Sequence, residues 1–260
     1  MLIYPCVAGK FYPDDPDLLR QNVLEMLSDA TDKAKLTPPK AIIAPHAGYI
    51  YSGSIAASAY ACLTKAKKRI KRVVLLAPSH RYPINSIATT SAEFYLTPLG
   101  KIPIDQENIA SIRLPYLDIA NEAFSVEHSL EVHLPFLQLT LETFSLVPLL
   151  VGLATTNQIE KILESLWDGS ETLIVISSDL SHYHHYELAL SLDKKTAEAI
   201  MALNPDGFTS EDACGSTAIK GLLTVAARKK MRVLQIDLRN SGDTAGDKNS
   251  VVGYGAFHFE

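Results

Sequence analysis

The stretch AIIAPHAGYIYSG, residues 41–53, joins a short apolar run to a histidine and then to small residues. Two similar apolar runs follow it, VVLLA at Val73–Ala77 and LIVI at Leu173–Ile176. Short, unbroken runs of β-branched residues and leucine are typical of strands that are buried on both faces of a parallel or mixed sheet. These three runs therefore predict the centre of an α/β fold.

Segments with helical spacing of apolar residues lie between the predicted strands. Alternating strands and helices predict a three-layer α/β domain, with helices on both sides of a central, mostly parallel or mixed sheet. We expect one domain over residues 1–260. Pro148 interrupts one further strand, so we expect that strand at a sheet edge or a bulge. The expected helices are 17–30, 54–66, 130–142, 158–167, 187–203 and 216–230, the further strands are 145–151, 232–238 and 251–259, and a hairpin is expected at 93–104.

Composition excludes several classes of protein. The chain has 260 residues, of which 47% are hydrophobic, and that content excludes an intrinsically disordered chain. A net charge of −5 excludes a broadly basic surface, so we expect no nucleic-acid partner. No apolar run reaches the roughly 18–20 residues of a membrane span, so we expect no membrane partner. Three cysteines do not build a disulfide framework, which favours the reducing cytoplasm.

Three histidines follow the three predicted central strands. His46, His80 and His182 each come shortly after the carboxyl end of an apolar run. Open α/β sheets bind ligands outside the carboxyl ends of their strands, so parallel strands would bring these histidines to one site. Neutral imidazoles are common ligands of zinc, copper and iron. Asp179, three residues before His182, is expected to accept a hydrogen bond from that ring and to orient it.

The segment EHSLEVH, residues 127–133, is dense in potential ligands. On a helix, His128 and Glu131 share a face at i,i+3 spacing. We interpret His128 as a pocket wall or an acid–base residue and Glu131 as a residue that orients a neighbour, with His133 and Tyr49 as further pocket residues. A helix start with solvated charges is the alternative for this segment.

Cys214 comes just before the predicted helix 216–230. A helix N-terminus lowers the pKa of a thiol and favours the thiolate, which is both a nucleophile and a soft metal ligand. Cys214 is therefore a candidate for either role.

Several motifs, in order along nearly the whole chain, resemble the Memo family. They are GKFYP at Gly9–Pro13, PHAGYIYSG at Pro45–Gly53, LLAPSH at Leu75–His80, EHSLEVHLPFLQ at Glu127–Gln138, SSDLSHY at Ser177–Tyr183, Cys214-Gly215 and NSGD…VVGYGAF at Asn240–Phe257. The resemblance implies a fold similar to class III extradiol dioxygenases, which hold non-haem iron with two histidines and a glutamate. It implies His46, His80 and Cys214 as metal ligands and His182 as the acid–base histidine. Two imidazoles and a thiolate suit copper first, with iron or zinc as alternatives.

The resemblance leaves three functions open. The first is a metal-dependent redox enzyme that uses copper or iron, in which His182, Asp179 and His128 are catalytic. The second is a non-catalytic module that binds a peptide or partner in the same cleft, and the third is a zinc hydrolase. The resemblance also implies a small molecule or peptide as ligand, and AMMECR1-like and radical-SAM proteins as partners.

Overall fold

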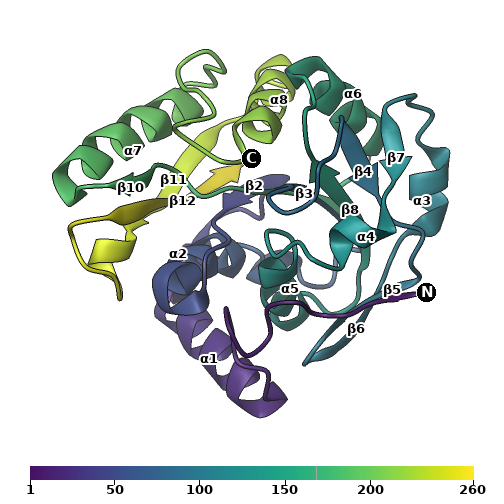
Figure 1. Cartoon of the computed structure of the whole chain (residues 1–260), viewed down its shortest axis with the longest axis horizontal. Helices are drawn as coiled ribbons and strands as arrows, with labels where there is room; N and C mark the ends of the chain where they lie inside the picture. The colour runs from purple at the N-terminus through teal and green to yellow at the C-terminus, as the bar shows by residue number, and fades with distance from the viewer. Residues whose placement is uncertain (168) are drawn as a thin grey trace.

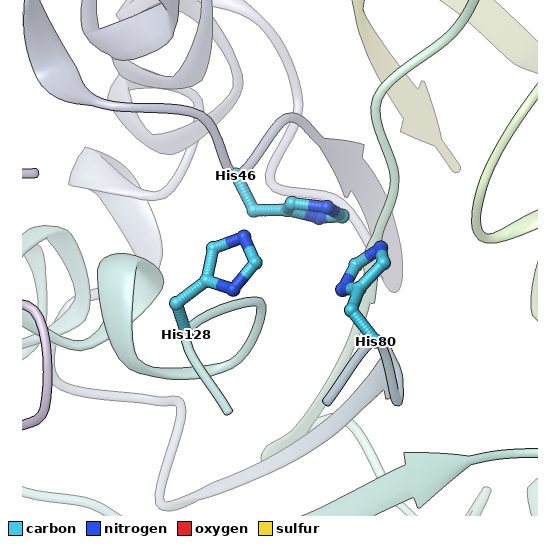
Figure 2. Close-up of side chains that lie close together, drawn as sticks. All are labelled: His46, His80 and His128. Carbon is cyan, nitrogen blue, oxygen red and sulfur yellow. The ribbon is translucent and has the colours of Figure 1, made fainter. Parts of the chain in front are cut away.

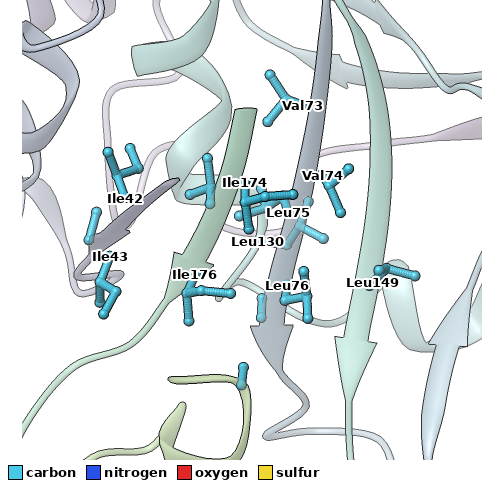
Figure 3. Packing of buried hydrophobic residues seen from close by; sticks show 14 of the residues in the cluster. Ile42, Ile43, Val73, Val74, Leu75, Leu76, Leu130, Leu149, Ile174 and Ile176 are labelled. Carbon is cyan, nitrogen blue, oxygen red and sulfur yellow. The ribbon is translucent and has the colours of Figure 1, made fainter. Parts of the chain in front are cut away.

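Four parallel strands form the centre of the sheet in the computed structural model, which describes residues 1–167 and 169–260. Nearly all of their side chains are buried, and Figure 3 shows isoleucine, valine and leucine side chains of neighbouring strands packed together. The parallel arrangement predicted from the three apolar runs is thus confirmed. In spatial order the four strands are β2 (Ala41–Ala44), β9 (Thr172–Ser177), β3 (Arg72–Pro78) and β8 (Ser145–Val151).

Antiparallel strands complete the sheet at both edges, which makes it mixed. Next to β2 lies β12 (Val251–Phe259), which is antiparallel to β2 and also pairs with β10 (His182–His184) and β11 (Val233–Asn240). At the other edge, β4 (Ile87–Thr89) is antiparallel to β8 and pairs with β7 (Leu117–Ile119). The described residues thus form one nine-stranded sheet.

Helices cover both faces of this sheet (Figure 1). The helices α1, α2 and α5 pack together on one face, whereas α6, α7 and α8 lie on the other. This is the single three-layer α/β domain that the alternation of elements predicts. The helices are α1 (Pro16–Asp29), α2 (Tyr49–Ala61), α3 (Gln106–Ser111), α4 (Asn121–Phe124), α5 (Leu134–Thr140), α6 (Thr156–Leu166), α7 (Tyr186–Met201) and α8 (Ser216–Arg228), and the 3-10 helices are η1 (Thr31–Lys35), η2 (Thr64–Ala66), η3 (Glu131–His133) and η4 (Ser241–Asp243). Within the described ranges, no helix combines the length and the apolar character that crossing a membrane requires.

A small second sheet contains the predicted hairpin. The strands β5 (Phe94–Thr97) and β6 (Gly100–Pro103) are antiparallel, and β1 (Leu2–Ile3) pairs with β5 in parallel. The backbone N–H of Asp105 donates to the carbonyl of Leu146 in β8 at 2.8 Å, which attaches the end of the hairpin to the main sheet.

The prediction for Pro148 is wrong, because β8 is an inner strand and pairs with β3 in unbroken register. The carbonyl of Pro148 accepts a hydrogen bond from the Thr89 hydroxyl of β4, so the proline nitrogen faces β4 and not β3. On that side β4 pairs only with Leu150 and Val151. The missing N–H therefore removes no bond from the ladder to β3.

Two helix boundaries differ from the prediction in ways that affect the site. Helix α2 begins at Tyr49 and not at Ser54, so Tyr49 lies on a helix that packs against the sheet. Residues 127–130 are not helical, and the helical part of the segment starts with η3 at Glu131. The i,i+3 relation expected between His128 and Glu131 therefore does not exist.

Candidate metal centre

Three histidines from separate segments meet beyond the carboxyl ends of the central strands. His46 follows β2, His80 follows β3, and His128 lies in the loop before η3. One ring nitrogen from each lies within 4.8 Å of the other two, so the group could hold a metal ion. Figure 2 shows the three rings directed toward one another, with ring centroids 5.2 to 5.6 Å apart.

The His46 ring is held from behind by polar groups of the neighbouring strand. Its Nδ1 lies 2.6 Å from the hydroxyl of Ser177 at the end of β9, and this hydroxyl donates to the carbonyl of Ser129. The backbone N–H of His46 donates to Asp179 Oδ1 at 2.8 Å. Burial lowers the pKa of His46 well below its ordinary value, and the neighbouring imidazoles lower it further. His46 is therefore neutral at pH 7, which is the form that binds metals.

Glu127 organises the other two histidines. Its Oε1 lies 3.1 Å from His80 Nδ1, and its Oε2 accepts the backbone N–H of His80 at 2.5 Å. Burial raises the pKa of this carboxyl, but His128, His80 and backbone N–H groups lower the pKa by more, to well below its usual range. Glu127 is therefore a buried carboxylate ion that fixes the loop after β3 against the loop before η3.

The three rings fit a metal site. Metal-binding histidines generally pair their second ring nitrogen with an oxygen, as His46 does with Ser177 and His80 does with Glu127. This pairing leaves Nε2 of both rings for a metal ion, and Nε2 of His46 also lies near Cys214 Sγ. His128 Nδ1 is buried without a hydrogen bond, although Glu127 Oε1 lies 3.1 Å from it.

Cys214 lies beside this group but is not one of its members. Its Sγ is 3.5 Å from His46 Nε2 and accepts the backbone N–H of Asp179 at 3.2 Å. A nitrogen and a sulfur bound to one tetrahedral zinc ion would be roughly 3.5 Å apart, given bonds of about 2.0 and 2.3 Å. Burial, followed by the charge of Asp179, raises the pKa of the Cys214 thiol to about 12. The expected lowering by the helix N-terminus is thus wrong, because desolvation outweighs it.

Asp179 and His182 occupy the same region but are not paired as predicted. In the ranges that the structure describes, Asp179 accepts the N–H of His46, and no hydrogen bond joins it to His182. Burial raises the pKa of Asp179, and its hydrogen bond from His46 opposes that shift. His182 begins β10 and lines the cavity described next. Asp179 therefore positions the loop of His46 and not the ring of His182.

A cavity of about 770 Å³ opens beside the three histidines. Its wall includes His46, His80, His128, Asp179 and His182, which come from four segments of the chain. The volume falls within the range of small-molecule sites in proteins.

The other three residues predicted for this pocket, Tyr49, His133 and Glu131, do not line the cavity. The hydroxyl of Tyr49 donates to the carbonyl of Val132, and His133 Nδ1 lies 2.8 Å from the hydroxyl of Tyr60. All three are buried. They lie within the packing between helices because α2 starts at Tyr49 and the helical turn starts only at Glu131.

Glu131 instead holds the N-terminal segment in place. Its Oε2 accepts the backbone N–H of Cys6 at 2.7 Å, and its Oε1 accepts the N–H of Val7 at 3.1 Å and the hydroxyl of Tyr12 at 2.6 Å. The segment held in this way includes Phe11, whose ring contacts His128 edge-on at 4.9 Å between centroids.

Comparison with known proteins identifies the family. A family model described as Memo-like protein matches residues 4–258. The chain belongs to the Memo family. A MEMO1 family protein of Aquifex aeolicus is 36% identical over 265 residues, which cover 96% of each chain. MEMO1 family proteins of Methanosarcina barkeri and Methanopyrus kandleri are each 33% identical to this chain and cover 98% of it. The matches span 99% of the Methanosarcina protein and 98% of the Methanopyrus protein.

Sequence reasoning missed several residues of this Memo protein's site. Glu127 and Ser177 are the first residues of the motifs EHSLEVHLPFLQ and SSDLSHY but were given no role, and the only local signal for Arg81 is its position directly after His80. Lys10 and Phe11 belong to the motif at Gly9–Pro13 but were given no place in the site, because this segment lies more than a hundred residues from His128 and only the folded chain brings Phe11 against that ring.

Proposed function

We propose that this Memo-family protein is a metal-dependent oxidoreductase that acts on a small molecule in the cavity. The observation that carries the proposal is the group of three imidazoles at the cavity wall, two of them oriented from behind by Ser177 and Glu127. Copper is the first expectation for the metal, and iron or zinc are the alternatives. We further infer, from the family resemblance, that the fold is that of class III extradiol dioxygenases.

His46 and His80 are the ligands on which the resemblance and the geometry agree. His128 is favoured as the third ligand by its distance to both, whereas Cys214 is favoured by the resemblance and by its 3.5 Å separation from His46 Nε2. A bound copper or iron ion would supply one-electron chemistry, and a thiolate ligand would favour copper.

The remaining polar residues of the cavity serve proton transfer and positioning in this proposal. His182 lines the cavity and is not part of the three-histidine group, so its ring is available to hold or release a proton. Asp179 holds the backbone of His46 and thereby keeps that ring in place.

The test is a metal analysis of protein purified without oxygen. We expect stoichiometric metal in the wild type and its loss in His46→Ala and His80→Ala. The exposed His185, which lies at the start of α7, provides the matched control His185→Ala, which should keep the metal. Unchanged metal content in His46→Ala and His80→Ala would refute the ligand assignment. Comparing His128→Ala with Cys214→Ala then identifies the third ligand, and oxygen consumption with copper redox cycling tests the activity.

A zinc hydrolase is the second candidate function. Three imidazoles at the wall of an open cavity resemble the ligand set of zinc enzymes that keep one position for water. Ester hydrolysis by the zinc-loaded protein, without oxygen consumption by the copper-loaded protein, would favour this function.

A peptide- or partner-binding role is the third candidate. Ile50 and Tyr183 line the cavity and are 69% and 77% exposed, so they would suit a partner surface. Binding of a partner by metal-free protein would favour this role. AMMECR1-like and radical-SAM proteins are the partners we propose to test first, and we place the protein in the reducing cytoplasm, where its three free cysteines would stay reduced.

A further inference from the structure

A run of cationic residues lies before β3, at the end of the sheet opposite the histidine group. Residues 64–72, TKAKKRIKR, contain six lysines and arginines and no aspartate or glutamate, although the chain as a whole has a net charge of −5. Because β3 is seven residues long, its two ends are roughly 20 Å apart. This positive charge is therefore separate from the cavity beside His80, and the composition of the chain does not account for it.

Among the described residues, three lysines of this run contact a single carboxylate. The Nζ atoms of Lys67 and Lys68 lie 4.0 and 3.9 Å from the same oxygen of Glu142. Lys71 donates to the hydroxyl of Thr143, which carries no charge. Since one carboxylate balances one positive charge, the three lysines together keep a net positive charge.

The two arginines of the run differ in their partners. Arg72 is half-buried and donates from Nε to Asp105 Oδ2 at 3.1 Å. Arg69 is exposed, and within residues 1–167 and 169–260 its side chain forms no ion pair or hydrogen bond. The run also contacts Glu171, whose carbonyl accepts two backbone N–H groups of the run. Lys65 apart, five cations thus meet three acidic residues in the part of the chain that is described, which leaves an excess of positive charge.

A pocket of about 330 Å³ opens beside the run. Glu142 and Thr143, which contact the lysines, belong to its wall together with two more cations, Arg20 and Lys101. Both of these cations are exposed. The rest of the wall is mainly apolar and includes Leu99, Ile102, Leu139, Leu141 and Phe144. An apolar hollow thus lies among cationic side chains, and we call residues 64–72 with this pocket the basic face.

Hydrogen bonds hold the parts of the basic face in place. Gln138 of α5 accepts the hydroxyl of Thr97 at 2.6 Å and donates to the carbonyl of Gly100 at 3.2 Å, which fixes the β5–β6 hairpin against this helix. The N–H of Glu142 donates to the carbonyl of Lys67 at 3.1 Å, which fixes the run against the chain after α5. A surface held in this way loses little entropy when it binds a partner.

We propose that the basic face binds an acidic peptide segment of a partner protein. The carboxylates of the segment contact the cations of residues 64–72, and one large apolar side chain of the segment enters the pocket. Complementary charge favours an acidic partner. The apolar wall favours a peptide over a nucleic acid, which would bind such a surface mainly through its phosphates. This inference does not depend on the proposed function, because the basic face and the cavity lie at opposite ends of the sheet.

The test is fluorescence anisotropy on the full-length protein with labelled heptapeptides. The probe is Glu-Asp-Glu-Phe-Asp-Glu-Asp, and a second peptide has glycine in place of the phenylalanine. We expect the phenylalanine peptide to bind roughly tenfold more tightly than the glycine peptide, because its ring buries apolar surface in the pocket. Leu99→Ser should remove most of this difference, since Leu99 belongs to the apolar wall. Binding of both peptides should weaken as the ionic strength rises.

The triple variant Lys67→Gln/Lys68→Gln/Arg69→Gln tests the charge of the basic face. We expect it to bind the phenylalanine peptide roughly tenfold more weakly, since each exposed ion pair contributes a small factor and three are removed. The matched control is Lys194→Gln/Lys195→Gln/Lys248→Gln, which removes the same charge from exposed positions on α7 and in the loop before β12.

Equal affinities of the two triple variants for the phenylalanine peptide would overturn the proposal. Equal affinities of the wild type for the two peptides would overturn it as well, because the pocket would then hold no side chain. Tighter binding of a single-stranded thymidylate dodecamer than of the phenylalanine peptide would also overturn it, since the basic face would then recognise phosphates.

Discussion

Replacing Glu127 by glutamine should destabilise the protein far more than an exchange of one atom suggests. Glu127 is 1% exposed and accepts backbone hydrogen bonds through both of its oxygens. Its Oε2 accepts the N–H groups of His80 and Arg81, and its Oε1 accepts those of His128 and Ser129. These bonds join the loop after β3 to the loop before η3.

The magnitude follows from the geometry of the amide. Glutamine has one acceptor oxygen, so in either orientation its NH₂ group faces two backbone N–H donors that lose their acceptor. Each unsatisfied buried donor costs about 1–3 kcal/mol. Glu127→Gln should therefore lower the free energy of unfolding by about 2–6 kcal/mol, a large part of the stability of a typical domain.

Glu131→Gln is the control, because Glu131 is equally buried and its bonds are distributed unequally. A glutamine whose oxygen takes the place of Oε1 keeps the bonds from Val7 and Tyr12 and loses only the bond from Cys6. This variant should lose about 1–3 kcal/mol.

Urea unfolding at pH 7, with a chelator present so that metal does not contribute, measures both variants. A loss below about 1 kcal/mol in Glu127→Gln, or a loss no larger than that of Glu131→Gln, would refute the reasoning.

Three further predictions concern the rest of the molecule. Gly253→Ala should lower the free energy of unfolding by about 2–4 kcal/mol, because the new Cβ would lie 2.1 Å from the carboxylate of Asp193, which accepts the N–H of Ser181. Gly48→Ala is the control, because a Cβ at Gly48 makes only ordinary contacts and should change the free energy of unfolding little. Similar urea midpoints for the two variants would contradict this prediction. Burial raises the pKa of Asp193 to about 6, so the stability that its protonated form contributes is complete below about pH 4 and falls by about 2–3 kcal/mol as the pH rises through 6. Asp193→Asn should lack this decline when urea unfolding is measured between pH 4 and 7. Parallel pH dependences of the free energy of unfolding for the variant and the wild type would count against this prediction. Chelation should lower the melting temperature of metal-loaded wild type but not of His46→Ala, and an equal fall in both would argue against metal binding at this site.

The sheet was predictable because its central strands are uniformly apolar. Ala41–Ala44, Val73–Ala77 and Leu173–Ile176 have no polar face, and only a position between helical layers buries both sides of a strand. The same reasoning predicts His46 and His80 beyond the carboxyl ends of the central strands, which is where they lie in the structure. The prediction for Pro148 is wrong because the sequence around a proline does not show which neighbouring strand its nitrogen faces. That depends on how β8 pairs with β3 and β4.

The rest of the site depends on contacts between distant segments. The i,i+3 relation between His128 and Glu131 holds only if the predicted helix 130–142 extends back to His128, but Glu127 forms its bonds with the loop after β3 and residues 127–130 are not helical. For Cys214 the local rule for a helix N-terminus gave the wrong direction of pKa shift, since the burial of the thiol comes from the packing of the whole domain.

The position of β12 has a consequence for synthesis on the ribosome. Val251–Phe259 is the last of these strands to be made, yet it lies between β2, the first strand of the main sheet, and β10, whose first residue is His182. Chains fold from the N-terminus as they emerge, so β2 must wait with one edge unpaired while the chain between them is translated. We therefore expect the loops that carry His46 and His182 to reach their final positions only after this strand has left the exit tunnel, so the cavity beside the three histidines is completed after β12 has been made.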